Sequence, residues 1–398
     1  MKIVLLTNIL SPYRKVFYDK LYTCFQEKGV NFTVLVMAET EPHRHWHFQE
    51  YKGEYCELLD SRTITYKNIH FHFNKNLKKR IKELEPDILI ASGSYLSPSI
   101  FRVIEWKKKF GYQLFFWSES HLDETRNYGG IKLLLREWIR GFCYKRFDGY
   151  WYAGKKSFEF IKTYSNVKVG KKNNLYQKPY YFIPNLVEHD LYNGCNKVDI
   201  AQKEALRKKF NLPSEQYLIV IAARLEPEKG ILPFLKLFRY CEHKEKATVI
   251  IMGDGSLREQ VEQLIVEYQL NVRLTGYLKQ KEILNYYTIA DCFALPSLSD
   301  ANPLSCIEAL WAGLPLFVSN HVGNYPETIK DGENGYVFCY RNTKEMIQLM
   351  DKLIISSEDW RKNASKVSLD IANKVYEPNR AVSTLVENML NIGDKRFT

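Results

Sequence analysis

The strongest chemical signal in the sequence is a segment that combines two acids with the start of a helix. It reads Pro296-Ser-Leu-Ser-Asp300-Ala-Asn302-Pro303-Leu304-Ser305-Cys-Ile-Glu308-Ala-Leu-Trp-Ala-Gly313. Asn302 is a favourable N-cap, Pro303 suits the first helical position, and Gly313 ends the helix. The free amides at residues 303–305, aided by the helix dipole, would bind a phosphate group.

The two acids of this segment stand on either side of the helix start. Glu308 lies less than two turns into the helix on an otherwise apolar face, so its carboxylate needs a partner such as two vicinal hydroxyl groups. Asp300, in the loop before the helix, could bind a second set of hydroxyls. The alternative is a capped helix that carries one acid in an unusual place.

A second segment, Ala222-Ala-Arg-Leu-Glu-Pro-Glu-Lys-Gly230, directly follows an expected strand. It places Arg224 and Lys229 where a diphosphate could bind, and Gly230 where a helix begins. A basic loop with surface ion pairs is the alternative interpretation.

Two weaker segments follow neighbouring strands. Ile251-Met-Gly253-Asp254-Gly-Ser-Leu257 forms a tight turn that allows close backbone approach to a ligand, although taken alone the segment favours a simple turn. In Leu274-Thr-Gly-Tyr277-Leu278 a strand enters a turn that could bring the backbone of Tyr277 and Leu278 to a nucleobase, or it is an ordinary strand exit. Neither segment is the Gly-x-Gly-x-x-Gly fingerprint of nicotinamide cofactors.

Alternating strands and helices must position these segments. Short, continuous apolar runs separated by helical spacing predict parallel sheets with helices on both faces. The expected helices include 16–28 and 133–147. The expected strands are 3–7, 32–37, 88–92, 114–118, 149–153 and 181–184, then 217–222, 248–252, 273–275, 292–295, 316–319 and 336–338.

Two such series predict an α/β protein with two Rossmann-like, doubly wound domains. Because ligands of these sheets bind beyond the carboxyl ends of the strands, we expect the domains to face each other across a cleft that holds the site. The expected N-terminal domain spans 1–190, and the C-terminal domain, which carries the four segments described above, spans 191–379. A last helix at 380–398 is expected to pack back on the N-terminal domain.

Together the four segments resemble the donor site of retaining glycosyltransferases of family four (glycosyl transferases group 1), which have the GT-B fold. In that family a Gly-Arg-Leu-x-x-x-Lys-Gly loop binds the donor diphosphate, and Arg224 and Lys229 match it, with Ala223 in place of the first glycine. The Glu-x7-Glu motif appears as Asp300-x7-Glu308, in which the second acid holds the ribose hydroxyls and the first contacts the transferred sugar. The resemblance implies these donor contacts: Arg224, Lys229, Gly253, Asp254, Tyr277, Leu278, Asp300, Asn302, Pro303, Leu304, Ser305 and Glu308.

The N-terminal half resembles the family mainly in its layout. Asn8-Ile-Leu-Ser11-Pro-Tyr13-Arg14 stands where many members have a Gly-Gly loop, and it is similar to the openings of some bacterial relatives. Ser11, Tyr13 and Arg14 are the candidate contacts to the acceptor or a phosphate, with a surface arginine as the alternative for Arg14. A His or acid after the fourth main strand contacts the donor sugar or accepts the acceptor's proton in this family. Glu119 is the first candidate here and His121 the second.

The resemblance implies retention through front-side attack, with no metal and no cofactor beyond the nucleotide diphosphate sugar. Arg224, Lys229 and the 303–305 amides would stabilise charge on the departing diphosphate. Glu119, His121 and Asp300 complete the catalytic candidates. The sequence has no Asp-x-Asp tripeptide, and no carboxylate is evident as a nucleophile.

The charge of the chain is unevenly placed. The 398 residues carry a net charge of +11, and residues 1–190 hold 31 Lys and Arg against 20 Asp and Glu, whereas 191–398 hold 26 of each. The basic half could bind an anionic membrane, a phosphate-bearing acceptor or nucleic acid, or form a solvated surface. We expect a glycan or lipid-linked acceptor in polysaccharide or glycolipid biosynthesis, and no nucleic acid.

The composition sets the expected location. The eight scattered cysteines lack a Cys-x-x-Cys pair, which indicates a reducing compartment and no structural zinc. The apolar start is too short for a signal peptide, and no stretch reaches the roughly 18 apolar residues of a spanning helix. We expect a cytoplasmic protein, either free or peripheral on the inner face of the membrane.

Three other functions remain open. A UDP-sugar 2-epimerase on the GT-B fold would release a free epimerised nucleotide sugar without an acceptor. A basic nucleic-acid-binding protein would bind with steep salt dependence, but leaves the acids of the second half unexplained. A non-catalytic relative of the glycosyltransferases could serve as a scaffold.

Overall fold

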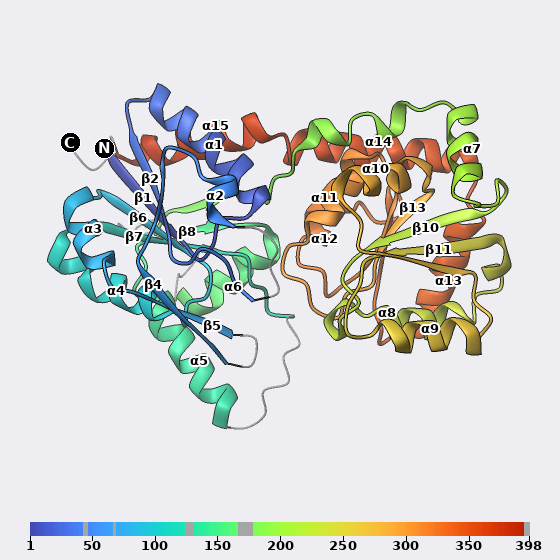
Figure 1. Cartoon of the computed structure of the whole chain (residues 1–398), viewed down its shortest axis with the longest axis horizontal. Helices are drawn as coiled ribbons and strands as arrows, with labels where there is room; N and C mark the ends of the chain where they lie inside the picture. Colours follow the sequence, from blue (N-terminus) through green and yellow to red (C-terminus); the bar gives the residue numbers. More distant parts are fainter. Residues whose placement is uncertain (43–46, 67–68, 124–130, 166–177, 394–398) are drawn as a thin grey trace, which may run out of the picture. The chain divides into compact units, whose positions relative to one another are not determined.

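The computed structural model describes the chain except for residues 43–46, 67–68, 124–130, 166–177 and 394–398. The chain divides into two compact units (Figure 1). Unit 1 comprises Met1–Leu122, Arg126–Leu186 and Pro378–Thr398, and unit 2 comprises Val187–Glu377 together with the short stretch 123–125.

A seven-stranded parallel sheet with the order β3-β2-β1-β6-β7-β8-β9 forms the centre of unit 1. In β1, Ile3 and Leu5 enter one hydrophobic core while Val4 and Leu6 enter another on the opposite face. Because helices cover both faces, the strand needs a continuous apolar run. The elements of unit 1 are β1 (Lys2–Thr7), α1 (Pro12–Glu27), β2 (Asn31–Val36), α2 (Phe48–Tyr51), β3 (Cys56–Leu58), β4 (Ser61–Tyr66), β5 (Ile69–Asn74), α3 (Leu77–Leu84), β6 (Ile88–Ser92), α4 (Pro98–Phe110), β7 (Gln113–Ser118), α5 (Ile131–Tyr144), β8 (Gly149–Tyr152), α6 (Lys155–Ser165), β9 (Tyr180–Phe182) and α15 (Pro378–Gly393).

The last helix, α15, packs against α1 within unit 1. Its apolar residues Val382 and Leu385 share a core with Phe17 and Leu21 of α1. At the edge of this contact the Lys20 ammonium donates to the Asn379 side-chain oxygen at 2.8 Å. The chain therefore returns to its first unit after it completes the second.

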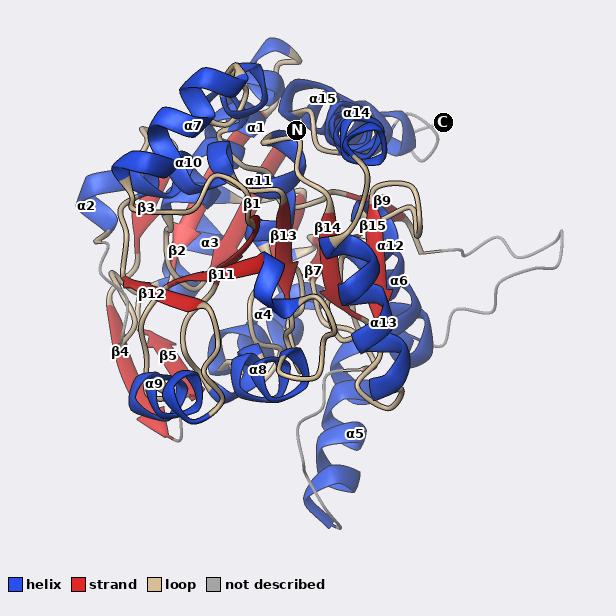
Figure 2. Ribbon diagram, turned by 90° about the vertical axis from the view of Figure 1, so that its right-hand side faces the viewer, coloured by secondary structure: helices blue, strands red, loops and turns tan. Residues whose placement is uncertain are grey.

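Unit 2 is built around a six-stranded parallel sheet with the order β12-β11-β10-β13-β14-β15. Along β10, Leu218 and Val220 enter one core, and Ile219 and Ile221 enter the core on the other face. Helices flank the red strands of the sheet in Figure 2. The elements of unit 2 are η1 (His189–Leu191), η2 (Cys195–Lys197), α7 (Ile200–Lys209), β10 (Tyr217–Ala222), η3 (Pro227–Lys229), α8 (Ile231–Phe238), η4 (Lys244–Lys246), β11 (Ala247–Met252), α9 (Arg258–Glu267), β12 (Val272–Gly276), α10 (Gln280–Ile289), β13 (Cys292–Leu295), α11 (Leu304–Trp311), β14 (Leu316–Ser319), α12 (Tyr325–Thr328), β15 (Gly335–Phe338), α13 (Thr343–Ile354) and α14 (Glu358–Val375).

The strands expected from the apolar runs are all present, with ends that shift by at most two residues. The pattern did not predict β3 or the antiparallel pair β4–β5. In β4 and β5 apolar and polar residues alternate, as in Ile-His-Phe-His-Phe. These two strands form a separate sheet, outside the seven-stranded sheet that helices cover on both faces. A search for continuous apolar runs passes over such a strand.

The described residues were expected to contain neither a membrane-spanning helix nor a metal site. No helix in the described part of the chain is long and apolar enough to cross a membrane. Within the same residues, no group of three or more His, Cys, Asp or Glu side chains could hold a metal ion.

Candidate functional site

The loops that follow β10 and β13 leave from neighbouring strands at the carboxyl edge of the unit 2 sheet. The strand order reverses between them, with β11 and β12 on one side and β14 and β15 on the other. Such a switch point is where doubly wound sheets bind ligands. The loops are joined directly, since the amides of Leu298 and Ser299 donate to the Glu228 carbonyl at 2.8 and 3.2 Å.

A largely buried ion pair connects these two loops. The Lys229 ammonium lies 2.5 Å from the Asp300 carboxylate, and the two side chains are only 18% and 13% exposed. The Ser297 hydroxyl donates to the same carboxylate at 3.5 Å. The structure therefore brings together Lys229, the predicted diphosphate contact, and Asp300, the predicted sugar contact.

Gly230 allows this close approach of the two loops. Its φ is +65°, and a Cβ atom there would lie 2.0 Å from the Pro296 carbonyl oxygen. The Tyr340 hydroxyl donates to the same carbonyl at 2.7 Å and to that of Gly230 at 3.2 Å. Tyr340 was not a candidate, because its position in the sequence gives no indication that it reaches these loops.

Replacing Gly230 by alanine is expected to destabilise unit 2 more than the same change at Gly332. Both glycines have positive φ, which costs alanine about 1–2 kcal/mol, but only Gly230 has atoms within 4 Å of the new methyl. The overlap with Pro296 should add at least about 1 kcal/mol. Chemical denaturation of both variants measures the difference, and equal losses would contradict the close contact between the loops.

Arg224, at the end of the β10 loop nearest the strand, has a side chain that is 62% exposed and pairs with Glu228 at 3.0 Å. A surface pair of this kind contributes about 0–1 kcal/mol. The guanidinium can therefore leave Glu228 for a more strongly charged partner, such as a diphosphate, at little cost.

Helix α11 begins one residue later than the sequence pattern predicted. Pro303 is the N-cap, with ψ 131°, and Leu304 is the first helical residue, so the assignment of Asn302 as N-cap is wrong. The helix starts later because Pro303 is extended and therefore not helical, and the Asn324 side chain donates to its carbonyl at 2.9 Å. Gly313 follows the C-cap with φ +72°, as predicted.

This shift leaves the chemistry of the helix start in place. Leu304 and Ser305 now occupy the first turn, where backbone amides lack partners within the helix. Asn302 is buried just before this turn. The amides that could bind an anion are therefore those of Leu304 and Ser305. Pro303 cannot take part as a donor because proline has no backbone N–H group.

Glu308 is held by tyrosines that the sequence did not point to. The hydroxyl of Tyr287 donates to its carboxylate at 3.2 Å, and the Tyr192 hydroxyl lies near enough to lower the pKa of the carboxyl group. Burial raises the pKa of Glu308, and the two hydroxyls act in the opposite direction. The sequence predicted that the Glu308 carboxylate would need two hydroxyl groups of a ligand. In the ligand-free protein, tyrosine hydroxyls lie near this carboxylate.

In the β11 and β12 loops the candidate donor contacts differ in their exposure and in their contacts with the rest of the protein. A Cβ at Gly253 would lie 2.0 Å from the Ala223 carbonyl oxygen, so this glycine permits contact between two loops. Asp254 pairs with Arg258 at 3.1 Å and accepts from the Gly255 amide at 2.8 Å. In the β12 loop Tyr277 is exposed, whereas Leu278 packs partly against a core.

The candidates in unit 1 meet at the end of β7. Arg14 forms an ion pair with Glu119, and its guanidinium lies 3.8 Å from the centre of the Trp117 ring. Burial lowers the pKa of Arg14, but Glu119 and nearby tyrosines outweigh it, and the pKa is raised overall. Arg14 is therefore not a surface arginine.

The other candidates of unit 1 lie at the start of α1 and in the segment after β7. Ser11 is the N-cap residue of α1 and is buried, and Tyr13 in the first turn of α1 is partly buried. His121, two residues after Glu119, is also buried. The structure thus joins Arg14 to Glu119 directly. Ser11 and Tyr13 lie at the start of α1, the helix that carries Arg14, and His121 lies in the segment after β7.

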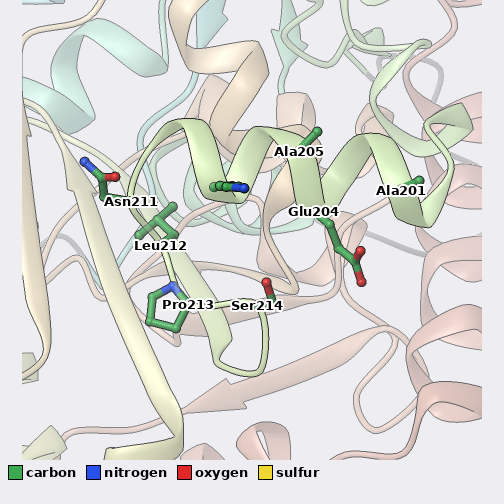
Figure 3. A pocket seen from close by; sticks show the side chains of 8 residues that line it. Ala201, Glu204, Ala205, Asn211, Leu212, Pro213 and Ser214 are labelled. Atoms are coloured by element: carbon green, nitrogen blue, oxygen red, sulfur yellow. The ribbon is translucent and has the colours of Figure 1, made fainter.

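A surface hollow beside α7 contains none of these residues (Figure 3). It is lined by Ala201, Glu204, Ala205, Lys208, Asn211, Leu212, Pro213 and Ser214. The segment 211–214 leads into the beginning of β10, so the hollow lies at the amino edge of the unit 2 sheet. The candidate residues of unit 2 lie at the opposite, carboxyl edge.

Two doubly wound parallel-sheet units are the architecture of GT-B glycosyltransferases, and this chain has that fold. The sucrose-phosphate synthase of Thermosynechococcus elongatus superimposes with a TM-score of 0.73 at 14% identity, over 99% of this chain and 100% of that structure. The HepE protein of Anabaena, solved in complex with UDP and glucose, superimposes with a TM-score of 0.70 at 13% identity, over 98% of this chain and 100% of that structure.

Residues 202–367, which lie within unit 2, match the family profile described as "Glycosyl transferases group 1". The alpha-monoglucosyldiacylglycerol synthase of Acholeplasma laidlawii is 25% identical over 202 residues, which is 49% of this chain and 50% of that protein. The chain spans about half the length of the curated relatives it matches. The family match includes the β10 and β13 loops described above.

Proposed function

We propose that the chain is a retaining, metal-independent glycosyltransferase of the hexosyltransferase type. It moves a sugar from a nucleoside diphosphate sugar to a hydroxyl group of a glycan or lipid-linked acceptor, in polysaccharide or glycolipid biosynthesis. The observation that carries the proposal is the Lys229–Asp300 pair at the switch point of the unit 2 sheet. The UDP and glucose bound by HepE and the lipid product named for the Acholeplasma synthase support it by analogy.

The donor lies against the carboxyl edge of unit 2 in this proposal. Arg224 and Lys229 bind the diphosphate together with the amides of Leu304 and Ser305. Glu308 accepts from the ribose hydroxyls, and Asp300 contacts the transferred sugar. Asp300 already holds the Lys229 ammonium, so the cation is positioned before the donor arrives.

Transfer breaks the bond between the anomeric carbon and the diphosphate oxygen and forms a bond to the acceptor oxygen. Negative charge builds on the departing diphosphate, where Arg224, Lys229 and the helix amides stabilise it without a metal. The acceptor hydroxyl attacks from the same face that the diphosphate leaves, and its proton passes to the leaving phosphate. Glu119 and His121 are the candidates of unit 1 for contact with the donor sugar or the acceptor.

The acceptor side of the proposal rests on unit 1. Arg14, with Ser11 and Tyr13, contacts a phosphate or the acceptor, and the Glu119 carboxylate keeps the Arg14 guanidinium in place. The positive half of the chain associates with an anionic membrane surface on the cytoplasmic side, which would bring the enzyme to a lipid-linked acceptor.

A thermal-shift screen across UDP, GDP, dTDP, CMP and ADP sugars tests the donor assignment. The true donor should raise the melting temperature, because a ligand at 100 times its Kd stabilises by about 2.7 kcal/mol. The shift and the turnover should both persist in excess EDTA, and NMR of the product should show a retained anomeric configuration. The absence of any nucleotide-dependent shift would contradict the proposal, and a free epimerised nucleotide sugar without acceptor would favour the 2-epimerase instead.

A further inference from the structure

Helix α5 of unit 1 exposes large apolar side chains that the fold does not use. Leu134 is 70% exposed and Trp138 is 66% exposed, and Leu133 and Leu135 are exposed beside them. Leu134 and Trp138 are four residues apart and therefore share one face of the helix, with Leu135 next to them. Contiguous exposed apolar residues of this kind mark a surface that is covered by a partner.

The opposite side of α5 fixes the helix firmly to unit 1. The Arg140 guanidinium donates to the Glu137 carboxylate at 2.7 Å and to the Tyr164 hydroxyl at 2.9 Å. Cys143 and Tyr144, near the end of the helix, are buried in a core of unit 1. In Figure 1 the first turns of α5 extend away from the sheet of this unit. The exposed apolar face is thus held in a defined orientation by the second half of the helix.

Cations and aromatic rings accompany the apolar face. The rings of Trp138 and Phe142 stack at 5.9 Å, and the Arg146 guanidinium lies 3.4 Å from the centre of the Phe142 ring. Lys145 and Arg146 are exposed at the end of the helix. Leucine and tryptophan on one face with lysine and arginine at its border is the composition of a helix that lies in a membrane interface.

We propose that α5 docks unit 1 onto an anionic phospholipid bilayer, with Leu134, Leu135 and Trp138 entering the headgroup region. The excess positive charge of residues 1–190 favours this partner, because anionic lipid attracts it. A second copy of the chain would instead bring the same cations against each other. The inference deepens the membrane association in the proposed function, but its test measures binding and does not depend on sugar transfer.

Vesicle sedimentation of the full chain tests the inference, with vesicles of phosphatidylcholine alone or mixed with phosphatidylglycerol. Native protein should bind the anionic vesicles more tightly, and the double variant Leu134→Gln, Trp138→Gln should lose at least about tenfold in partitioning. The matched control is Ile200→Gln, Val266→Gln, which changes two helix residues of unit 2 that are 70% and 77% exposed. The control should bind as the native protein does.

Two further measurements separate the inference from its alternatives. Brominated lipids should quench a part of the tryptophan emission that the Trp138→Gln variant lacks. Light scattering of native and variant protein should give the same mass. Three results would overturn the inference. The native protein and the α5 variant bind vesicles equally, the native protein does not bind them, or the mass falls only in the α5 variant. A normal melting temperature shows that the variant is folded.

Discussion

Replacing Lys229 by alanine is expected to lower turnover at least about 100-fold, with Arg224→Ala producing a loss of the same order. Each substitution removes a cation that would stabilise the charge developing on the diphosphate, which corresponds to a few kcal/mol of transition-state stabilisation. Lys229→Ala also removes the ion-pair partner of the largely buried Asp300 carboxylate. Steady-state kinetics with the donor selected by the thermal-shift screen measure both effects.

The control for these substitutions is Lys236→Ala, which removes an exposed lysine from the helix that follows the same loop. This variant should retain the turnover of the native protein. Melting temperatures of all three variants separate loss of structure from loss of chemistry. Near-normal turnover in both Arg224→Ala and Lys229→Ala would remove the donor-site assignment.

Replacing Glu308 by glutamine is expected to stabilise the ligand-free protein while it weakens donor binding. Charge-assisted hydrogen bonds contribute about 1.5–3 kcal/mol each, so losing the carboxylate from the ribose hydroxyls should weaken donor binding roughly tenfold to 100-fold or more. The stability gain arises because the burial that raises the pKa of Glu308 also disfavours its charged form. Glutamine has nearly the same shape and carries no charge.

The pH dependence of this gain has a definite sign. With its pKa raised above the ordinary 4.5, the folded Glu308 binds a proton more strongly than the unfolded one does, so its contribution to stability falls as pH rises through the raised pKa. Glu308→Gln lacks this loss. Its advantage in melting temperature should therefore be present at neutral pH and vanish below about pH 4.5.

The matched control for this prediction is Glu259→Gln, which neutralises an exposed acid of α9 in the same unit. It should change neither the melting temperature at neutral pH nor the affinity for the donor by much. If Glu308→Gln is less stable than the native protein at neutral pH and binds the donor unchanged, Glu308 serves the fold and the ribose contact is wrong.

The parallel sheets could be predicted from the sequence because both of their faces are buried. Strands such as β10 and β13 must then be apolar at every position, which a single sequence displays directly. The same reasoning explains why β4 and β5 were missed, since a hairpin outside the sheet needs apolar residues at only half of its positions. The switch point could be inferred only as a general property of such sheets until the strand order was known.

The site was less predictable than the fold, because several of its contacts join distant segments. Asn324 donates to the carbonyl of Pro303, the N-cap of α11, although 21 residues separate them. Tyr192 and Tyr287 reach Glu308 from two other segments, and no spacing in the sequence connects the three residues. By contrast, the proximity of Lys229 and Asp300 follows from their positions after two adjacent parallel strands.

The most direct measurement of the central claim is a crystal structure of the full chain with the nucleoside diphosphate that the screen selects. We expect the diphosphate to accept hydrogen bonds from the Lys229 ammonium and the Arg224 guanidinium at the start of α11, with the ribose hydroxyls at Glu308. A nucleotide bound elsewhere, with Arg224 still on Glu228 and no contact to Lys229, would contradict the account.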